Sequence, residues 1–237
     1  MRMRKKPNLE KRLADCAALI EVEPEKNAGV WKTKYAGYAG LHLEIGCGKG
    51  RFTAACAAEN KDILLAAVEK ERSAMVMAAE RARDAGLGNI RFIDIDAAKL
   101  KEIFAAGEVD RIYINFCDPW PKSRDAKFRL TAPAFLRSYA DVLPEGGEIH
   151  FKTDNLPLFT WSEEVMRQEG WELKEITNDL HANGTDGIIM TDYEAKFSAQ
   201  GVKINRLVAV KTAGTKDTSA GEPPRLRDAA LSDARNC

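Results

Sequence analysis

The chain has 237 residues, of which 45% are hydrophobic, enough for one α/β domain with appendages or for two small domains. Its 36 basic and 36 acidic residues balance, and this net charge alone does not indicate a nucleic-acid-binding protein. No apolar run is long enough for the core of a signal peptide or for a membrane span, and the five cysteines form no C-x-x-C pair. We therefore expect a cytoplasmic protein with reduced thiols, no metal site and no membrane partner.

Residues 1–40 are predicted to form a basic leader and connector. Within residues 1–12, six basic side chains accompany one acidic residue, Glu10. A helix is expected over residues 8–19, and a connector rich in lysine, glycine and tyrosine follows it. A charge run of this kind is usually solvated surface, so the leader alone indicates no partner.

From Leu41 onward, short apolar runs alternate with helical patterns. The expected strands cover residues 41–45, 64–68, 90–95, 109–114, 148–152, 171–176 and 203–210, and the expected helices cover 73–85, 132–143 and 159–168. This alternation predicts an α/β fold with a mostly parallel sheet and helices on both faces. A long polar segment without a clear helix separates the last two strands, which suits one antiparallel strand near the sheet edge. The domain is expected to span residues 41–211, and residues 212–237 are expected to be disordered because of their composition.

A glycine-rich loop follows the first expected strand. Gly46, Gly48 and Gly50 allow a tight turn and a close approach of the backbone to a ligand. A dinucleotide fingerprint would need a glycine at position 51, where the chain has Arg51. Glu44, two residues before the loop, would repel a pyrophosphate but attract a ligand that carries ammonium and sulfonium groups.

Two further acids occur at the ends of the next two strands. Glu69 ends the second strand, where a carboxylate can bind a ribose diol, and Asp96 lies just past the third, where it can accept from an adenine amino group. Either acid alone would be read as a solvated strand-end residue, but together with the glycine loop they form a consistent series. This series resembles the S-adenosylmethionine-dependent methyltransferases of the seven-stranded, Rossmann-like class.

The segment 115–122, NFCDPWPK, directly follows the fourth expected strand. Two prolines within three residues prevent both a helix and a continued strand, so a stiff turn presents an amide, a carboxylate, an indole and an ammonium group. In open α/β sheets, ligands bind outside the ends of strands such as this one. Three chemistries remain open for a methyl donor beside Asp118. They are attack by Cys117 on a pyrimidine ring, methylation of an exocyclic adenine amine, and methylation of a ring nitrogen that already has a lone pair.

Residues farther along the chain favour the ring nitrogen. Asp154 follows the fifth strand and Glu194 precedes the last one, so both are expected on the same rim as Asp118. Guanine offers N1–H and N2–H₂ donors to such a carboxylate, and its N7 edge would then face the methyl group. Tyr193 or Trp120 could stack on the splayed base.

The segment Asn115–Leu130, NFCDPWPKSRDAKFRL, together with Thr191-x-Tyr193-Glu194-x-x-Phe197, resembles the tRNA (guanine-N7-)-methyltransferase family. The resemblance covers residues 30–211 and implies methyl transfer from S-adenosylmethionine to N7 of guanine 46 in the tRNA variable loop, by a monomer or a homodimer. By position, it implies cofactor binding by Glu44, Gly46, Gly48, Gly50, Glu69, Asp96 and Asp118, with Asp118 also as the catalytic candidate. It implies substrate binding by Lys122, Asp154, Thr191, Asp192, Tyr193 and Glu194, and RNA contacts by Ser123, Arg124, Asp125, Ala126, Lys127, Phe128 and Arg129.

The resulting hypothesis is an in-line methyl transfer. The lone pair of N7 needs no prior deprotonation, so no catalytic histidine is required, and the rate would come chiefly from positioning and from the fixed charge of Asp118. Cys117 is then expected to be a buried packing residue. Alternatives are a methyltransferase acting on adenine N6 or cytosine C5, a non-catalytic tRNA-binding module, and an aminopropyl transferase of the same fold. The basic loop after Pro121 argues against the polycationic substrate of the last one.

Overall fold

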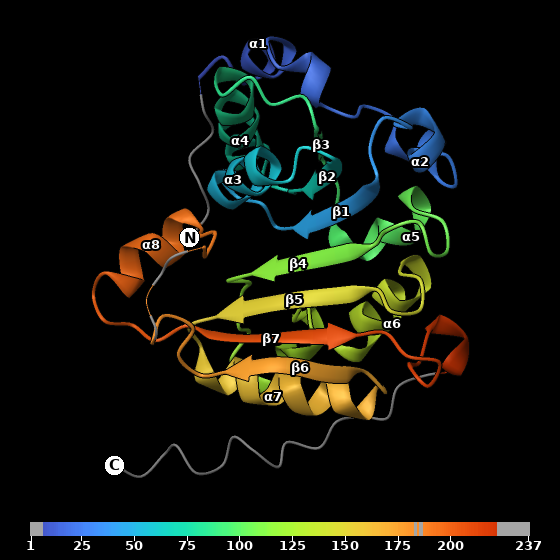
Figure 1. Ribbon diagram of the computed structural model, residues 1–237, viewed down its shortest axis with the longest axis vertical. Coiled ribbons are helices and arrows are strands. Elements are labelled where there is room, and N and C mark those ends of the chain that lie inside the picture. Colours follow the sequence, from blue (N-terminus) through green and yellow to red (C-terminus); the bar gives the residue numbers. More distant parts are fainter. Residues whose placement is uncertain (1–6, 183, 185–186, 222–237) are drawn as a thin grey trace.

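Figure 1 shows the computed structural model, which describes residues 7–182, 184 and 187–221. Its centre is a seven-stranded sheet with the strand order β3-β2-β1-β4-β5-β7-β6. The strands are β1 (Gly40–Ile45), β2 (Ile63–Val68), β3 (Ile90–Ile93), β4 (Arg111–Asn115), β5 (Glu148–Thr153), β6 (Glu172–Thr177) and β7 (Asn205–Val210). β7 runs antiparallel to β5 and β6, and the other neighbouring strands are parallel. The predicted fold class is therefore confirmed.

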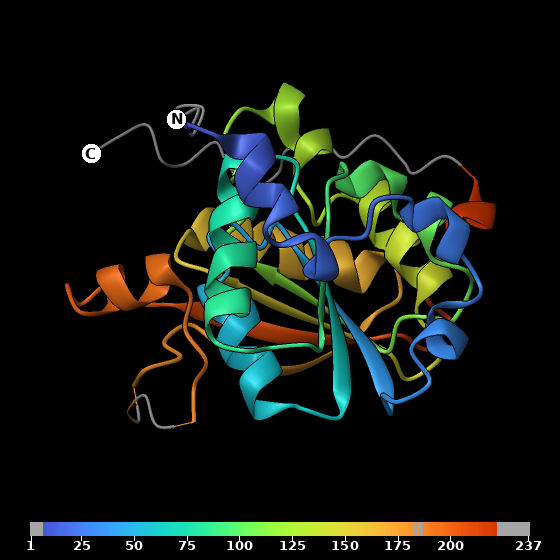
Figure 2. The same ribbon diagram turned by 90° about the horizontal axis from the view of Figure 1, so that it is seen from above.

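Helices cover both faces of the sheet, and Figure 2 shows the two layers. On one face, α3 (Arg51–Glu59), α4 (Arg72–Asp84) and α1 (Leu9–Ala14) share a buried cluster with side chains of β2, β3 and β4. On the other face, α5 (Leu100–Ile103), α6 (Pro133–Val142) and α7 (Leu156–Gln168) enclose the larger cluster. The short elements are η1 (Ala17–Leu19), η2 (Pro24–Asn27), α2 (Trp31–Lys34), η3 (Ala97–Lys99), η4 (Ser123–Phe128), α8 (Asp192–Ser198) and η5 (Thr218–Ala220). Among the described residues, no helix is long and apolar enough to cross a membrane.

The leader packs on the sheet edge beside β3. The helix expected over residues 8–19 is interrupted after α1, and the chain turns so that Cys16 and Leu19 join the same buried cluster as Leu13. Beyond η1, Ile20 forms a parallel bridge with Phe92 of β3. The leader therefore covers the edge of the strand and extends the apolar core.

Between β6 and β7 the chain forms α8, where we expected a polar segment without a clear helix. A capping box starts this helix: Thr191 Oγ1 accepts from the Glu194 N–H at 2.9 Å, and the Glu194 carboxylate accepts from the Thr191 N–H at 3.3 Å. The spacing Thr-x-x-Glu is itself a signal for a helix start, so this expectation overlooked a feature of the sequence. In Figure 1, α8 lies beyond the carboxyl ends of β4 and β5.

Thr212–Gly221 packs against α6 and α7, although we expected this segment to belong to a disordered tail. The Thr212 and Thr215 hydroxyls donate to the Gly170 carbonyl at 3.1 and 3.0 Å, and Thr218 Oγ1 donates to Asp141 at 2.7 Å. These hydrogen bonds hold in place a segment whose composition alone predicts no fixed structure. Residues 222–237 lie outside the described residues.

Candidate active site

The carboxyl ends of β1, β2, β4 and β5 meet at one rim of the sheet, on the left of Figure 1. The strand order reverses at β1, because the sheet continues through β2 on one side and through β4 on the other. Such a switch point is where open α/β sheets bind ligands. The register pairs Ile45 with both Val68 and Ile114, and Asn115 with Lys152. The glycine loop, Glu69 and the 115–122 turn, which continue from these neighbouring ends, therefore share the rim with Asp154.

The glycine loop has left-handed backbone at each of its glycines, with φ of 78° at Gly46, 57° at Gly48 and 73° at Gly50. A Cβ added at Gly50 would lie 2.5 Å from the Cβ of Ala78, so this glycine lets α3 approach α4. A Cβ at Gly46 or Gly48 would meet nothing within 4 Å. The backbone at Gly46 and Gly48 therefore faces space that a ligand can occupy.

Glu69 holds the glycine loop through backbone hydrogen bonds. Its two carboxylate oxygens accept from the N–H groups of Gly48 and Glu71, both at 2.9 Å. Each oxygen keeps a further lone pair, which a ribose diol could use. Asp96 lies past β3 on the adjoining part of the rim, is exposed, and accepts from the Ala98 N–H at 2.9 Å.

Glu44 is a buried carboxylate at the end of β1, with only 2% of its surface exposed. It accepts from Thr53 Oγ1 at 2.5 Å and, through its other oxygen, from Asn115 Nδ2 at 3.4 Å. Burial raises the pKa of Glu44 to about 7, and these two hydrogen bonds oppose the rise. A cationic ligand group beside Glu44 would favour its ionised form.

Asp118 lies on the turn after β4, and its side chain is exposed. Among the described residues, no hydrogen bond or ion pair engages its carboxylate. The turn around it has left-handed backbone at two aromatic residues, with φ of 53° at Phe116 and 42° at Trp120. The Phe116 N–H donates to the Lys152 carbonyl at 2.9 Å, so the start of the turn is anchored to β5.

Arg129 supports this turn from inside the protein. Its Nε donates to the Pro119 carbonyl and its Nη2 to the Trp120 carbonyl, both at 3.0 Å, and its guanidinium lies 4.3 Å from the ring centre of Trp161. Only 3% of Arg129 is exposed. Its guanidinium is therefore engaged within the fold, and the expected contact of Arg129 with RNA stays a prediction. Of the other residues expected to contact RNA, Asp125 and Ala126 are half-buried, whereas Ser123, Arg124, Lys127 and Phe128 are exposed, as is Lys122.

The first turn of α8 connects three parts of the rim. Asp192 forms ion pairs with Arg81 of α4 at 3.0 Å and with Arg51 of α3 at 3.9 Å. The Tyr193 hydroxyl donates to Asp154 Oδ2 at 2.8 Å. Asp192 and Tyr193 therefore bind to different elements. Together with Glu194, the next residue in the chain, they hold α8 over the rim.

Glu194 is the third of these side chains and has no exposed surface. Its carboxylate accepts from Lys152 Nζ at 2.7 Å and lies 3.1 Å from His181 Nε2. Lys152 also donates to the Ile189 carbonyl at 2.9 Å. Because the capping box uses the same carboxylate, Glu194 is fully engaged inside the protein.

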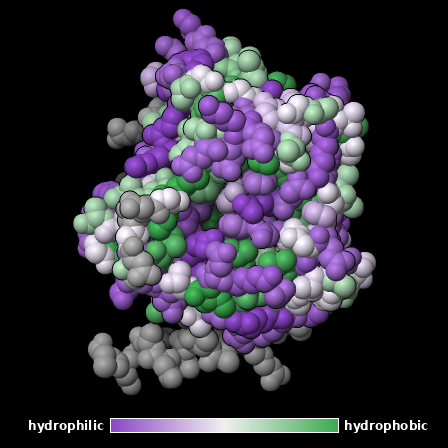
Figure 3. Space-filling view, viewed as in Figure 1, coloured by the Kyte–Doolittle hydropathy of each residue, from purple (hydrophilic) through white to green (hydrophobic). Residues whose placement is uncertain are grey.

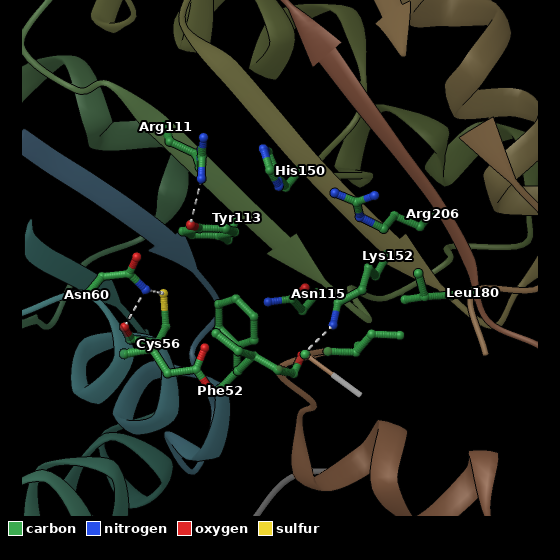
Figure 4. A pocket seen from close by; sticks show the side chains of 14 residues that line it. Phe52, Cys56, Asn60, Arg111, Tyr113, Asn115, His150, Lys152, Leu180 and Arg206 are labelled. Carbon is green, nitrogen blue, oxygen red and sulfur yellow. Dashed lines mark hydrogen bonds between the residues drawn. The ribbon is translucent and has the colours of Figure 1, made fainter. Parts of the chain in front are cut away.

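A cavity of about 420 Å³ lies on the face of β4 and β5 that adjoins α3. Figure 4 shows its polar floor, formed by Tyr113, Asn115, His150 and Lys152, and the ring of Phe52 beside it. Figure 3 shows that this face is hollowed and that hydrophilic side chains line much of the hollow. Asn115 is the last residue of β4 and Lys152 is the last but one of β5, so the cavity reaches the rim.

Sequence reasoning assigned no role to Thr53, Asn115, Lys152 or His181, yet the first two bind Glu44 and the last two bind Glu194. Asn115 and Lys152 are polar residues near the carboxyl ends of their strands, which is a signal that the sequence contained. His181 offered none, because its partner is set by the tertiary fold.

Comparisons with known proteins agree with this geometry. A family model described as "Putative methyltransferase" matches residues 39–207. A relative from Streptococcus suis (strain 05ZYH33), named tRNA (guanine-N(7)-)-methyltransferase, is 42% identical over 209 residues, which are 88% of this chain and 99% of the relative. A relative of the same name from Bacillus velezensis is 43% identical over 206 residues, 87% of this chain and 95% of the relative. The chain belongs to the tRNA (guanine-N(7)-)-methyltransferase family. The prediction of an S-adenosylmethionine-dependent methyltransferase is thereby confirmed.

Solved structures of lower identity share the fold. The 16S rRNA methyltransferase KamB has a TM-score of 0.60 at 18% identity, and the match covers 78% of this chain and 92% of KamB. A 16S rRNA (adenine(1408)-N(1))-methyltransferase from Catenulisporales acidiphilia has a TM-score of 0.56 at 15% identity, covering 81% of this chain and 92% of that one. At these identities the likeness shows the fold alone.

Proposed function

We propose that this protein transfers the methyl group of S-adenosylmethionine to N7 of a guanine in tRNA, and that the guanine is at position 46 of the variable loop. The observation that carries the proposal is the gathering of carboxylates at one rim, with Glu44 and Glu69 at the glycine loop and Asp118 on the adjoining turn. The names of the two curated relatives support guanine N7 as the target and tRNA as the substrate. We further propose that the protein acts in the cytoplasm, as a monomer or a homodimer.

The rim fits the cofactor in both charge and space. Gly46 and Gly48 leave room along the backbone, and Glu44 provides a buried carboxylate for an ammonium group. Glu69 can accept from a ribose diol, and the exposed Asp96 can accept from an adenine amine. When bound, S-adenosylmethionine supplies a sulfonium methyl group that the N7 lone pair can accept without prior removal of a proton.

Asp118 is the residue best placed to assist the transfer. The guanine ring gains positive charge as N7 is methylated, and a fixed carboxylate beside it stabilises that charge. Among the described residues no partner neutralises Asp118, so its charge is available to the substrate. The remaining rate enhancement would come from holding the base in line with the methyl group.

Asp154 is the better of the two candidate acceptors for the guanine edge. Its Oδ2 receives the Tyr193 hydroxyl, which leaves Oδ1 for the N1–H or N2–H₂ donors of guanine. Glu194, by contrast, is fully buried and already serves Lys152 and the cap of α8. We propose that Glu194 acts on the substrate indirectly, by fixing the position of Tyr193.

The geometry disfavours attack by Cys117 on a cytosine ring. Cys117 packs against the main core, and burial raises the pKa of its thiol to about 12. The thiolate that such an attack requires is therefore scarce near neutral pH.

The proposal is tested by incubating the protein with unmodified tRNA and methyl-labelled cofactor, and then identifying the labelled nucleoside. We expect 7-methylguanosine. Labelled 5-methylcytidine or N6-methyladenosine would select one of the other chemistries, and tRNA binding without any label would select the binding module. Asp118→Asn should lose most of the turnover and still bind tRNA, whereas Asp62→Asn, an exposed acid before β2, should match the wild type.

A further inference from the structure

Trp120 and Phe128 form an exposed aromatic pair beside the rim. Their exposed fractions are 36% and 49%, and their ring centres lie 5.3 Å apart at an interplanar angle of 51°. A second aromatic group lies at α8, where Tyr193 packs against Phe116 at 5.1 Å and Phe197 at 4.2 Å. Within the described part of the chain, no ring contact joins the two groups, so they are separate surfaces.

The backbone at Trp120 is strained, and the protein maintains the strain. A φ of 42° is unfavourable for a bulky side chain and persists only where the surrounding structure enforces it. Arg129 enforces it by binding the Pro119 and Trp120 carbonyls while its guanidinium stacks on Trp161. Because the indole is partly exposed, the strained turn does not serve to fill the core. A strained backbone that presents an aromatic side chain to solvent indicates that this side chain binds a ligand.

The charges around the pair indicate which ligand. Lys127 Nζ lies 5.2 Å from the ring centre of Phe128. Lys122 and Arg124 are exposed on the same segment. Exposed aromatic rings flanked by cations are the arrangement with which proteins bind single-stranded nucleic acid, since the rings stack on bases and the cations bind phosphates.

We propose that Trp120 and Phe128 stack on an unpaired nucleobase of the RNA substrate other than the guanine that receives the methyl group. The identity of that RNA rests on the proposed function. The target guanine has its own acceptor and ring at Asp154 and Tyr193, so the pair is free to hold a second base. Arg129 is then a positioning residue, which acts through the Trp120 backbone.

The first test measures tRNA affinity and methyl transfer in substituted proteins. Trp120→Leu should weaken tRNA binding by about 5- to 100-fold, the usual range for loss of one stacked base, whereas Trp120→Phe should retain most of the affinity. The loss should appear in tRNA affinity, and affinity for S-adenosylmethionine should stay unchanged in both variants. Val22→Ser, at an exposed apolar residue of the leader, is the matched control. Equal tRNA affinity in Trp120→Leu and the wild type would overturn the proposal, as would a loss confined to turnover.

The second test identifies the base with tRNA transcripts that each carry one abasic nucleotide at an unpaired position. One position other than the target should weaken binding to the wild type, and Trp120→Leu should bind that transcript no worse than the intact one. The absence of any such coupled position would overturn the proposal, and so would a change in oligomeric state by light scattering without a change in tRNA affinity. Because this test reads binding alone, it stands even if the wild type forms no 7-methylguanosine.

Discussion

Glu44→Gln should remove a large pH dependence from the stability of this protein. Glu44 is 2% exposed, and burial raises the pKa of its carboxyl from 4.5 to about 7. Because the folded state binds this proton more tightly than the unfolded state, the stabilisation is fully present below pH 4.5 and is lost as the pH rises through 7. One pKa unit corresponds to about 1.4 kcal/mol, so the rise from 4.5 to about 7 corresponds to about 3 kcal/mol of unfolding free energy.

Urea unfolding at pH 5 and pH 8 measures this loss. The wild type should lose up to about 3 kcal/mol more than Glu44→Gln between these two pH values, since glutamine does not titrate. Glu102→Gln, at an exposed glutamate of α5, should behave like the wild type. Parallel pH profiles for the wild type and Glu44→Gln would refute the argument that burial controls this carboxyl.

Three further substitutions test the supports of the site by urea unfolding. Lys152→Met should lower the free energy of unfolding by about 3–5 kcal/mol, because it leaves the buried Glu194 charge without its closest partner. The double variant Lys152→Met with Glu194→Leu should recover much of that loss. If the costs of the two single substitutions simply added in the double variant, the pairing would be contradicted. Gly50→Ala should lower the free energy of unfolding by about 2–4 kcal/mol, because the backbone there is left-handed and the added Cβ would lie 2.5 Å from the Cβ of Ala78. A loss under about 1 kcal/mol would show that α3 and α4 move apart to accommodate the methyl group. Arg129→Met should lower the free energy of unfolding by about 2–4 kcal/mol, because two carbonyls lose their donor. The salt dependence of tRNA binding should stay unchanged. A slope of log K against log salt concentration that is smaller by about 0.9 would instead show that Arg129 contacts a phosphate.

The alternation of elements and the acids at strand ends could be predicted because both depend on local pattern. Parallel strands align their carboxyl ends, so Glu44, Glu69 and Asp118 had to share a rim once the strands were identified. The capping box of α8 was also present in the sequence, but Thr191 and Glu194 had been interpreted only as substrate residues. A motif that matches a function can hide an equally good structural use of the same side chains.

Tertiary partners account for what the sequence did not predict. Arg129 lies in a basic segment and resembles its exposed neighbours, and only the fold brings Trp161 and the Pro119 carbonyl to it. Likewise, Thr212 and Thr215 belong to a segment of loop-like composition that Gly170 holds in place. Such contacts depend on distant residues, and no local periodicity encodes them.

The central claim is that this rim methylates guanine N7 at position 46 of tRNA. The most direct test uses two tRNA transcripts that differ only at that position, one with guanosine and one with 7-deazaguanosine, which lacks the acceptor nitrogen. With labelled S-adenosylmethionine, the first transcript should accept one methyl group and the second none. Equal labelling of both transcripts would contradict the claim.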